Sequence, residues 1–500
     1  MRHRELKPWH APIAVMLERH KRTGPVSFHV PGHQFGRGVN DIPGIPSADL
    51  LAPLKQVMGI DITELSFSDD LHDPSGAIAE AEQLAAACFG AQKTYLLVGG
   101  STSGNIAMIL ASCKPGERLL VQRNVHKSVI NGLMLAGAEA VFLNPTIEEN
   151  TGLSLPPSPA VVEQALKRYP DAKGLLLTNP SYYGLSVNLL PYASLLHDKG
   201  KLLLVDEAHG AHYGHHAAFP TSAVQAGADV VVQSTHKTLH ALTMGAMLHT
   251  QGELIDHAAL RHALQMVQSS SPSYPILASL DIARAMLDTY GEAWFGPGLA
   301  AVQKVREALY AAGGRFEAVQ IEHEQYRMDP LRLLLQDKLG KLSGFEMQQQ
   351  LEKHNIWTEM ADPKRVVLLF GAQTTEADAE RLIKALCHIE DEQSGLSGDG
   401  WSTVATGAYE DELDEQLAAI SEPVLFDRSP VQSMVVDLQA AVGRCSAEMV
   451  VPYPPGIPLL YRGECITPQA VKRIRGLAAS GARFQGSSDA AMRTISILVP

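Results

Sequence analysis

The stretch Leu202-Leu-Leu-Val-Asp-Glu-Ala-His-Gly210 is the most informative in the chain, because a short apolar run ends directly at a carboxylate. A run of this kind, rich in Leu and Val, is typical of a strand that is buried on both faces of a parallel sheet. Similar runs alternate with helical stretches at 94–98, 118–121, 140–143, 174–177 and 230–233. The alternation predicts a doubly wound α/β domain that binds its ligands at the carboxyl ends of its strands.

The chain is long enough for further domains on either side of this region. A helical pattern at 75–90 ends at a glycine, and a second, long helical pattern runs from 281 to 308. Strand candidates follow at 331–334 and 366–369, and prolines between 452 and 458 exclude a regular helix or a central strand there. We predict an N-terminal arm (1–60), a large domain (61–285), a small α+β domain (286–395), an acidic linker (396–415) and a C-terminal domain (416–500).

Composition excludes several classes of protein. The formal net charge of −13 argues against a nucleic-acid or anionic-membrane partner, because phosphate binding needs clustered Lys and Arg. No apolar run follows the charged N-terminus, and none elsewhere is long enough to span a bilayer. The 5 cysteines are scattered without a C-x-x-C pair, which speaks against a disulfide framework and a zinc site. We expect a cytoplasmic protein without a bound metal.

A glycine-rich turn follows the first strand of the predicted sheet. It reads Gly99-Gly-Ser-Thr-Ser-Gly-Asn105 and precedes an apolar helix at 106–111. Such a turn lets the backbone approach an anion, while hydroxyls and the helix N-terminus supply donors, so it is a candidate phosphate cradle. It lacks the Gly-Lys-Ser/Thr ending of a P-loop and the G-x-G-x-x-G spacing, which argues against nucleotide binding. Taken alone, it fits a plain glycine turn with an N-cap serine equally well.

Two further residues lie at predicted strand ends. Asp206 follows the strand at 202–205, where a carboxylate is costly unless a cation such as a protonated pyridine nitrogen meets it. The strand at 230–233 ends in Ser234-Thr-His-Lys237, and a lysine at the mouth of a sheet can form a Schiff base. Each residue alone also fits an N-cap or a surface charge. Together, the order of phosphate turn, aspartate and lysine predicts a site for pyridoxal 5'-phosphate (PLP).

One histidine fits the same plan. His126 lies a few residues after the strand at 118–121, where its imidazole is placed to stack on a flat cofactor ring. An isolated histidine in such a position also fits a purely structural role.

The chain resembles a known family, the PLP-dependent ornithine/lysine/arginine decarboxylases of fold type I. The resemblance covers nearly the whole chain and is carried, besides the glycine turn, by Phe28-His-Val-Pro-Gly-His33, Asp69-Asp-Leu-His-Asp-Pro-Ser-Gly76, Asn124-Val-His-Lys-Ser128, Asp206-Glu-Ala-His-Gly210, Ser234-Thr-His-Lys237 and Pro452-Tyr-Pro-Pro-Gly-Ile-Pro458. It implies an aspartate aminotransferase-like large α/β domain with a mostly parallel sheet, followed by smaller α+β C-terminal domains. The likeness is greatest to short Gram-positive forms without an N-terminal response-regulator-like wing domain.

The resemblance also implies roles for single residues. Lys237 would be the Schiff-base lysine, Asp206 the partner of the pyridine nitrogen and His126 the ring-stacking imidazole. His209 stands where the long enzymes of the family carry a tryptophan. Further contacts to PLP or its phosphate are implied for Ser101, Thr102, Ser103, His209, Ser234, His236 and Ser270. The segment 269–274 resembles one that reaches the cofactor phosphate across a dimer interface, which implies a homodimer or a larger homo-oligomer.

The implied reaction is the α-decarboxylation of arginine, lysine or ornithine to agmatine, cadaverine or putrescine with release of CO2. In it the substrate displaces Lys237, Asp206 keeps the electron sink protonated, and Lys237 or a nearby histidine returns a proton to Cα. An acidic side chain is expected to face the distal cation of the substrate. Candidates by their place in the family motifs are Glu64, Asp69, Asp70 and Glu464. The sequence leaves open which of the three amino acids is preferred.

Two other functions stay open. The glycine turn, Asp206 and Lys237 by themselves also permit a PLP-dependent aminotransferase or another amino-acid lyase, and only the family motifs argue against these. A catalytically silent PLP-fold protein that binds or regulates is the second alternative. The complete set of Lys237, Asp206 and His126 counts against it.

Overall fold

The computed structural model divides the chain into two compact units, each assembled from several segments. It describes residues 7–38, 48–321, 323–394, 419–426, 428–429, 432–453, 456–487 and 489–499. The first unit comprises Met1–Ser112, Leu202–Ala217 and Thr221–Trp294, and the second comprises Cys113–Lys201, Ala218–Pro220 and Phe295–Pro500. Among the described residues, no helix is both long enough and apolar enough to cross a bilayer.

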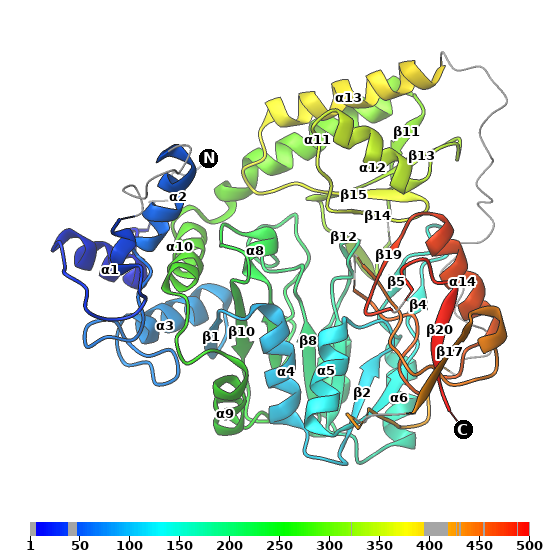
Figure 1. Ribbon diagram of the computed structural model, residues 1–500, viewed down its shortest axis with the longest axis horizontal. Coiled ribbons are helices and arrows are strands. Elements are labelled where there is room, and N and C mark those ends of the chain that lie inside the picture. The colour runs from blue at the N-terminus through cyan, green and yellow to red at the C-terminus, as the bar shows by residue number, and fades with distance from the viewer. Residues whose placement is uncertain are drawn as a thin grey trace. The chain divides into compact units, whose positions relative to one another are not determined.

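Four adjacent strands form the sheet of the first unit (Figure 1). Their order is β1 (Lys93–Leu97), β10 (Ala246–Thr250), β9 (Val230–Gln233) and β8 (Leu202–Asp206). β8 and β9 run parallel, whereas β10 is antiparallel to both of its neighbours. The predicted strands occur within a residue or so of their expected ends. The sequence pattern does not predict β10, because its run Ala246-Met-Leu-His-Thr250 carries polar residues that are nevertheless buried.

A row of buried polar side chains crosses this sheet, with one member from each strand or its end. Glu207, directly after β8, accepts a hydrogen bond from the amide of Gln233 in β9 at 2.7 Å. The amide oxygen of Gln233 lies 3.0 Å from Nε2 of His249 in β10, whose Nδ1 lies 2.8 Å from the hydroxyl of Thr94 in β1. We call these four residues the polar row. Burial lowers the pKa of His249 to about 3 and raises that of Glu207 to about 8, so His249 is neutral.

The helix α4 (Gly100–Ser112) packs on this sheet and begins earlier than expected. The helix starts at Gly100, so the glycine turn is its first turn rather than a loop before it. Gly100 itself has a φ of +72°, which favours glycine. A side chain at Gly104 would come within 2.8 Å of Leu97 and Val232, so glycine is required for this close approach. The other helices of the unit are α1 (Pro12–Arg22), α2 (Ala48–Met58), α3 (Ala77–Phe89), α8 (Thr235–Thr238), α9 (His257–Val267) and α10 (Tyr274–Tyr290).

The second unit holds the other predicted strands. β2 (Arg118–Gln122) lies between β6 (Gly174–Thr178) and β3 (Glu139–Leu143) and is parallel to both. The short β16 (Val424–Leu425) adds an antiparallel strand to β3. Helices of this part are α5 (Lys127–Ala136), α6 (Pro159–Arg168) and α7 (Leu190–His197), and short strands are β4 (Thr146–Ile147), β5 (Ser154–Leu155), β7 (Leu185–Val187) and β12 (Tyr326–Met328).

A separate antiparallel sheet follows, and it contains the strands predicted around 331–334 and 366–369. Its order is β11 (Phe316–Ala318), β13 (Arg332–Asp337), β15 (Arg365–Leu369) and β14 (Met360–Ala361). The helices α11 (Gly296–Ala312) and α12 (Gly344–Lys353) pack on it, and α13 (Glu376–Ser394) packs on α11 (Figure 1).

The long helix expected over 281–308 is wrong. α10 ends at Tyr290, and a 3-10 turn (Gly291–Phe295) separates it from α11. Gly291 has a φ of +55°, which a continuous helix does not allow, and a proline follows in the first turn of α11. The apolar periodicity persists across the break, so periodicity alone could not locate it.

The C-terminal part has its own small core, built from two strand pairs and one helix. β17 (Ser433–Asp437) pairs with β20 (Thr494–Leu498), and β18 (Val451–Tyr453) with β19 (Arg483–Gln485). The helix α14 (Pro468–Ala479) contributes Val471 and Ile474 to the buried cluster. The predicted linker (396–415) lies outside the described residues, as do parts of the predicted N-terminal arm. The boundaries of the five predicted domains stay predictions.

Candidate active site

Asp206 is the last residue of β8, and its carboxylate is almost fully buried. The side chain is 2% exposed. One oxygen accepts from the amide of Asn105 in α4 at 2.8 Å, and the other accepts from the backbone N–H of Ala208 at 3.1 Å. Within the described parts of the chain, no basic side chain forms an ion pair with it. A buried carboxylate held by two neutral donors fits a cationic ligand atom.

Lys237 lies one helical turn beyond the end of β9, in α8. Its Nζ is 2.9 Å from Nε2 of His209, which is buried. An ammonium group only donates, so a protonated Lys237 requires Nε2 of His209 as the acceptor; a neutral Lys237 can instead accept from His209. The pair therefore holds a proton between an amine and an imidazole. His209 thus places an imidazole beside the candidate Schiff-base lysine.

The N-terminus of α4 carries the hydroxyl groups that were predicted from the glycine turn. Ser234, at the end of β9, donates from its hydroxyl to that of Ser101 at 2.8 Å. Thr102 is exposed, whereas Ser103 is buried and donates to the carbonyl of Gly100 at 2.8 Å. Ser101 and Ser234 thus meet at the N-terminus of a 13-residue helix. Such a position favours an anion.

PLP needs three features in a protein: an acidic partner for its pyridine nitrogen, a lysine and a phosphate site. Asp206 offers a buried negative charge, Lys237 an amine, and Ser101 with Ser234 hydroxyls at a helix N-terminus. All of them belong to the first unit and follow strands of one sheet or begin the helix packed on it. The residues of this unit therefore fit the cofactor.

The other predicted cofactor residues of the first unit lie nearer its surface. Nδ1 of His236 is 2.9 Å from the carbonyl of Gly245, which fixes the imidazole. Ser270 is exposed, and the carbonyl of the preceding Ser269 lies 2.9 Å from Nε2 of His72. An exposed serine segment is available to a second copy of the chain.

His126 belongs to the second unit, where it is the N-cap of α5. Its Nδ1 accepts from the backbone N–H of Ser128 at 3.2 Å and lies 2.8 Å from the hydroxyl of that residue. A side chain at Gly456 would lie 3.1 Å from Cδ2 and Nε2 of His126, and Gly456 has a φ of +89°. The imidazole is thus held from one side by its helix and from another by the C-terminal segment.

Arg123 anchors that C-terminal segment, at long range in the sequence. Its Nη2 donates to both carboxylate oxygens of Glu464 at 2.8 Å, and its guanidinium lies 3.8 Å from the ring centre of Tyr461. Burial raises the pKa of Tyr461 to about 12, and the hydroxyl donates to the carbonyl of Arg123 at 2.5 Å. Arg123 is three residues before His126, so this cluster steadies the loop that carries the histidine.

The four candidate substrate carboxylates are found in different surroundings. Glu464 is paired with Arg123. Asp69 caps the N-terminus of α3, where it accepts from the backbone N–H groups of Ser75, Gly76, Ile78 and Ala79. Asp70 accepts from the N–H of His72 at 2.8 Å. Glu64 accepts from Thr63, and its other oxygen is buried without a hydrogen-bond partner among the described residues. Of the four, Glu64 retains an unused buried oxygen.

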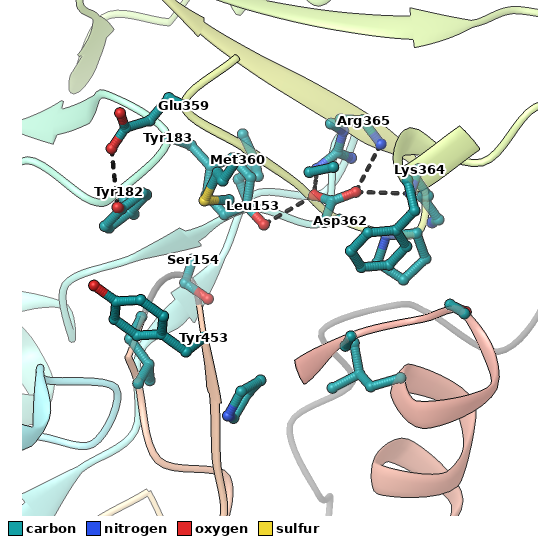
Figure 2. A pocket seen from close by; sticks show the side chains of 18 of the residues that line it. Leu153, Ser154, Tyr182, Tyr183, Glu359, Met360, Asp362, Lys364, Arg365 and Tyr453 are labelled. Atoms are coloured by element: carbon teal, nitrogen blue, oxygen red, sulfur yellow. Dashed lines mark hydrogen bonds and ion pairs between the residues drawn. The ribbon is translucent and has the colours of Figure 1, made fainter. Parts of the chain in front are cut away.

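The second unit also contains a cavity of about 630 Å³ (Figure 2). Gln122, Asn124 and Thr178 line it at the carboxyl ends of β2 and β6. Figure 2 shows the hydroxyl of Tyr182 directed at Glu359, to which it donates a hydrogen bond of 3.0 Å. The figure also shows hydrogen bonds or ion pairs between Asp362 and neighbouring residues. Tyr183 donates to Asp362 at 2.8 Å. The lining carries charges of both signs, because Glu352, Glu359 and Asp362 share it with Lys364, Arg365, Arg473 and Arg483.

Models of one protein family match the chain. The model described as Orn/Lys/Arg decarboxylase, major domain, matches residues 11–320, and the C-terminal domain of the same family matches residues 428–487. The chain belongs to the Orn/Lys/Arg decarboxylase family. This confirms the family predicted from the motifs and makes the chain a carboxy-lyase of the kind that acts on basic amino acids.

Relatives match the Orn/Lys/Arg decarboxylase chain over almost its whole length. A Bacillus subtilis protein named uncharacterized protein YaaO is 38% identical over 95% of this chain and 96% of its own. The arginine decarboxylase of Bacillus subtilis is 32% identical over 97% of both chains. Lysine decarboxylase A from Pseudomonas aeruginosa has a similar structure, with a TM-score of 0.81 and 20% identity over 98% of this chain and 80% of its own. The last comparison confirms the predicted fold-type I α/β class.

Several residues of the site were not predicted from the sequence. Asn105 was quoted only as the end of the glycine turn, yet its amide binds Asp206. Arg123 and Tyr461 had no assigned role, although they join His126 to the C-terminal segment. The sequence did contain a signal for the role of Asn105, because a polar residue on an otherwise apolar helix face needs a buried hydrogen-bond partner. No local pattern links Arg123 to Tyr461.

Proposed function

We propose that the chain catalyses the PLP-dependent α-decarboxylation of a basic L-amino acid, and that arginine is the substrate. The observation that supports the cofactor is the buried Asp206 carboxylate beside the strand that leads to Lys237, and the match to the family's major domain supports decarboxylation. The choice of arginine is supported by the B. subtilis relative of that name, which aligns over nearly the full length of both chains. Lysine and ornithine are the alternatives.

When bound, PLP supplies an electron sink for the bond to the departing carboxylate. Asp206 would be the partner of the pyridine nitrogen, and Asn105 and the Ala208 N–H keep its carboxylate in place. Ser101 and Ser234 would bind the phosphate together with the first N–H groups of α4. The residues thus orient the cofactor from two ends.

Lys237 and His209 provide the proton that the reaction needs after CO2 has left. At 2.9 Å, the two nitrogens share one proton, and either is able to pass it to the substrate Cα when Lys237 is free. His126 is proposed to face the cofactor ring, and Gly456 leaves room for its imidazole. Ser270 is proposed to act in a homodimer, because the segment around it is exposed.

The distal guanidinium requires a carboxylate that is not already paired. Glu464 and Asp69 are committed to Arg123 and to a helix N-terminus, and Asp70 accepts from the N–H of His72. Glu64, with its unused buried oxygen, is therefore the better candidate. Glu64→Gln is expected to raise KM for arginine about tenfold more than does Glu253→Gln, a change at an exposed residue of the same unit.

The proposal is tested by end-point release of CO2 and amine from the purified, PLP-loaded protein. L-arginine, L-lysine and L-ornithine are supplied in parallel, with Lys237→Ala as the blank and Lys199→Ala as a surface control. Agmatine from arginine, at more than about a thousandfold above the blank, is the expected result. Cadaverine or putrescine instead would overturn the choice of arginine. A cofactor absorbance band that depends on Lys237, with no amine from any substrate, would overturn decarboxylation and favour an aminotransferase, for which keto-acid-dependent turnover is the assay.

A further inference from the structure

Cys445 and Cys465 lie opposite each other across two antiparallel chain segments. The N–H groups of Ser446 and Ile466, which flank the two cysteines, each donate to the opposite segment at 2.9 Å. This pattern makes the cysteines a non-hydrogen-bonded pair, the type in which facing side chains are closest. Cα atoms in such a pair are about 4.5 Å apart, within the range of about 4.4–6.8 Å that disulfides span.

Both thiols point to the same, solvent-facing side of this strand pair. Cys445 and Cys465 are exposed, whereas the next residues, Ser446 and Ile466, are fully buried. This alternation is what an antiparallel pair with one buried face requires. The carbonyl of Cys445 also accepts from the N–H of Leu498 at 2.9 Å, so the backbone is fixed from both sides.

The other described cysteines lack this arrangement. Cys88 and Cys113 lie in apolar surroundings, and burial raises the pKa of each thiol to about 12, which makes them poor nucleophiles. Cys387 is exposed on α13, without a cysteine opposite it on a neighbouring strand. Cys445 and Cys465 are therefore the pair that combines exposure with proximity.

We propose that Cys445 and Cys465 form a redox modification site that reacts with low-molecular-weight disulfides. One cysteine attacks the small disulfide, forms a mixed disulfide with one half and releases the other half as a thiol. The second cysteine then attacks the protein sulfur of the mixed disulfide, forms the 445–465 disulfide and releases the second thiol. The two cysteines lose two electrons to the small disulfide, and their two protons end on the released thiols.

The link would close a loop that carries contacts to the candidate active site. The residues between the cysteines include Gly456, which lies against His126, and Glu464, which binds Arg123. Closing the loop restricts the open states of this segment. Oxidation is therefore expected to slow proteolysis within 446–464 by about tenfold or more.

The test uses the full-length PLP-loaded protein, reduced and then equilibrated with mixtures of reduced and oxidised glutathione. Remaining thiols are alkylated, and peptides are analysed by mass spectrometry before and after reduction. Wild type and Cys387→Ser are expected to yield the 445–465 linked peptide. Half-oxidation is expected at an oxidised-glutathione fraction at least about tenfold lower than that needed to modify Cys387 in the wild type, because the closing step is intramolecular.

The single variants Cys445→Ser and Cys465→Ser distinguish a pair from two independent thiols. Each is expected to trap the remaining cysteine as a glutathione adduct and to lose the protease protection, and a thermal melt checks that each is folded. Separate glutathione adducts on both cysteines of the wild type, without a linked peptide, would overturn the proposal. So would a linked peptide found only in covalent dimers on a non-reducing gel.

Discussion

The two units place their candidate catalytic groups in different ways. In the first unit, Asp206 and Lys237 follow two parallel strands directly, and the residues that hold them come from the same sheet or from the helix packed on it. In the second unit, His126 depends on Gly456 and on the pair of Arg123 with Glu464, more than 300 positions apart in the sequence. A site at strand ends is visible in a sequence, whereas one braced by a distant segment is not.

The largest expected effect concerns the strand-end site. Asp206→Asn keeps the size of the side chain but removes its charge, so the buried partner of a cationic nitrogen is lost. We expect kcat for decarboxylation to fall by about 100- to 1000-fold. The control is Asp229→Asn, an equally buried acid directly before β9, which should change kcat by less than about threefold. Equal losses in both variants would show that burial, not position, governs the effect.

Glu207 gives the first unit a stability that depends on pH. Burial raises its pKa from 4.5 to about 8, so the folded state holds a proton that the unfolded state releases above pH 4.5. The favourable term is complete below pH 4.5 and is lost as the pH rises towards 8. We expect the free energy of unfolding to fall by roughly 2–4 kcal/mol across this range. Urea unfolding from pH 5 to 9 measures it. Glu207→Gln should reduce the fall to the part contributed by Glu82, whose pKa burial also raises to about 8, while exposed Glu149→Gln should leave it unchanged.

Gly104 tests how closely α4 must approach the first unit's sheet. Gly104→Ala puts a methyl group within 2.8 Å of Leu97 and Val232, and we expect it to lower the free energy of unfolding by about 1–3 kcal/mol. Gly296→Ala, in a helix with open space around it, should be neutral or slightly stabilising. Thermal melts compare the two. A neutral Gly104→Ala would mean that the helix moves away without cost.

The smallest expected effect concerns the long-range support of His126. Glu464→Gln weakens the bond to Arg123, and we expect kcat to fall by about three- to tenfold with little change in KM, because the variant acts through the position of His126. Glu422→Gln, which breaks an exposed pair with Arg168, should have no effect on either constant. A larger rise in KM than fall in kcat would instead assign Glu464 to the substrate.

The difference between the units also explains what the sequence could predict. The strands β2, β3, β6, β8 and β9 were found because each is a continuous apolar run, and Asp206 and Lys237 because they follow such runs. β10 was missed because His249 and Thr250 give its sequence a polar pattern, although both residues are buried in the structure and His249 has a hydrogen-bond partner there. The break at Gly291 was missed because apolar spacing continues through it. Backbone conformation and distant partners leave no trace in local spacing.

The same limit applies to Cys445 and Cys465. Their spacing matches no common cysteine motif, and the scattered cysteines of the sequence argue against a disulfide framework. Only the pairing of the two segments brings the thiols together. A reversible link between two surface cysteines is a different feature from a structural framework, and the sequence prediction about frameworks does not address it.

The polar row has a consequence for how the first unit assembles. Thr94, His249, Gln233 and Glu207 match donor to acceptor only when all four strands are aligned as observed. A slip of one residue between any two strands would turn a member of the row to the opposite face and leave its neighbours unsatisfied. Apolar runs of Val and Leu tolerate several strand registers, whereas the polar row is satisfied in only one of them. By fixing where β8 and β9 end, it fixes where Asp206 and Lys237 stand.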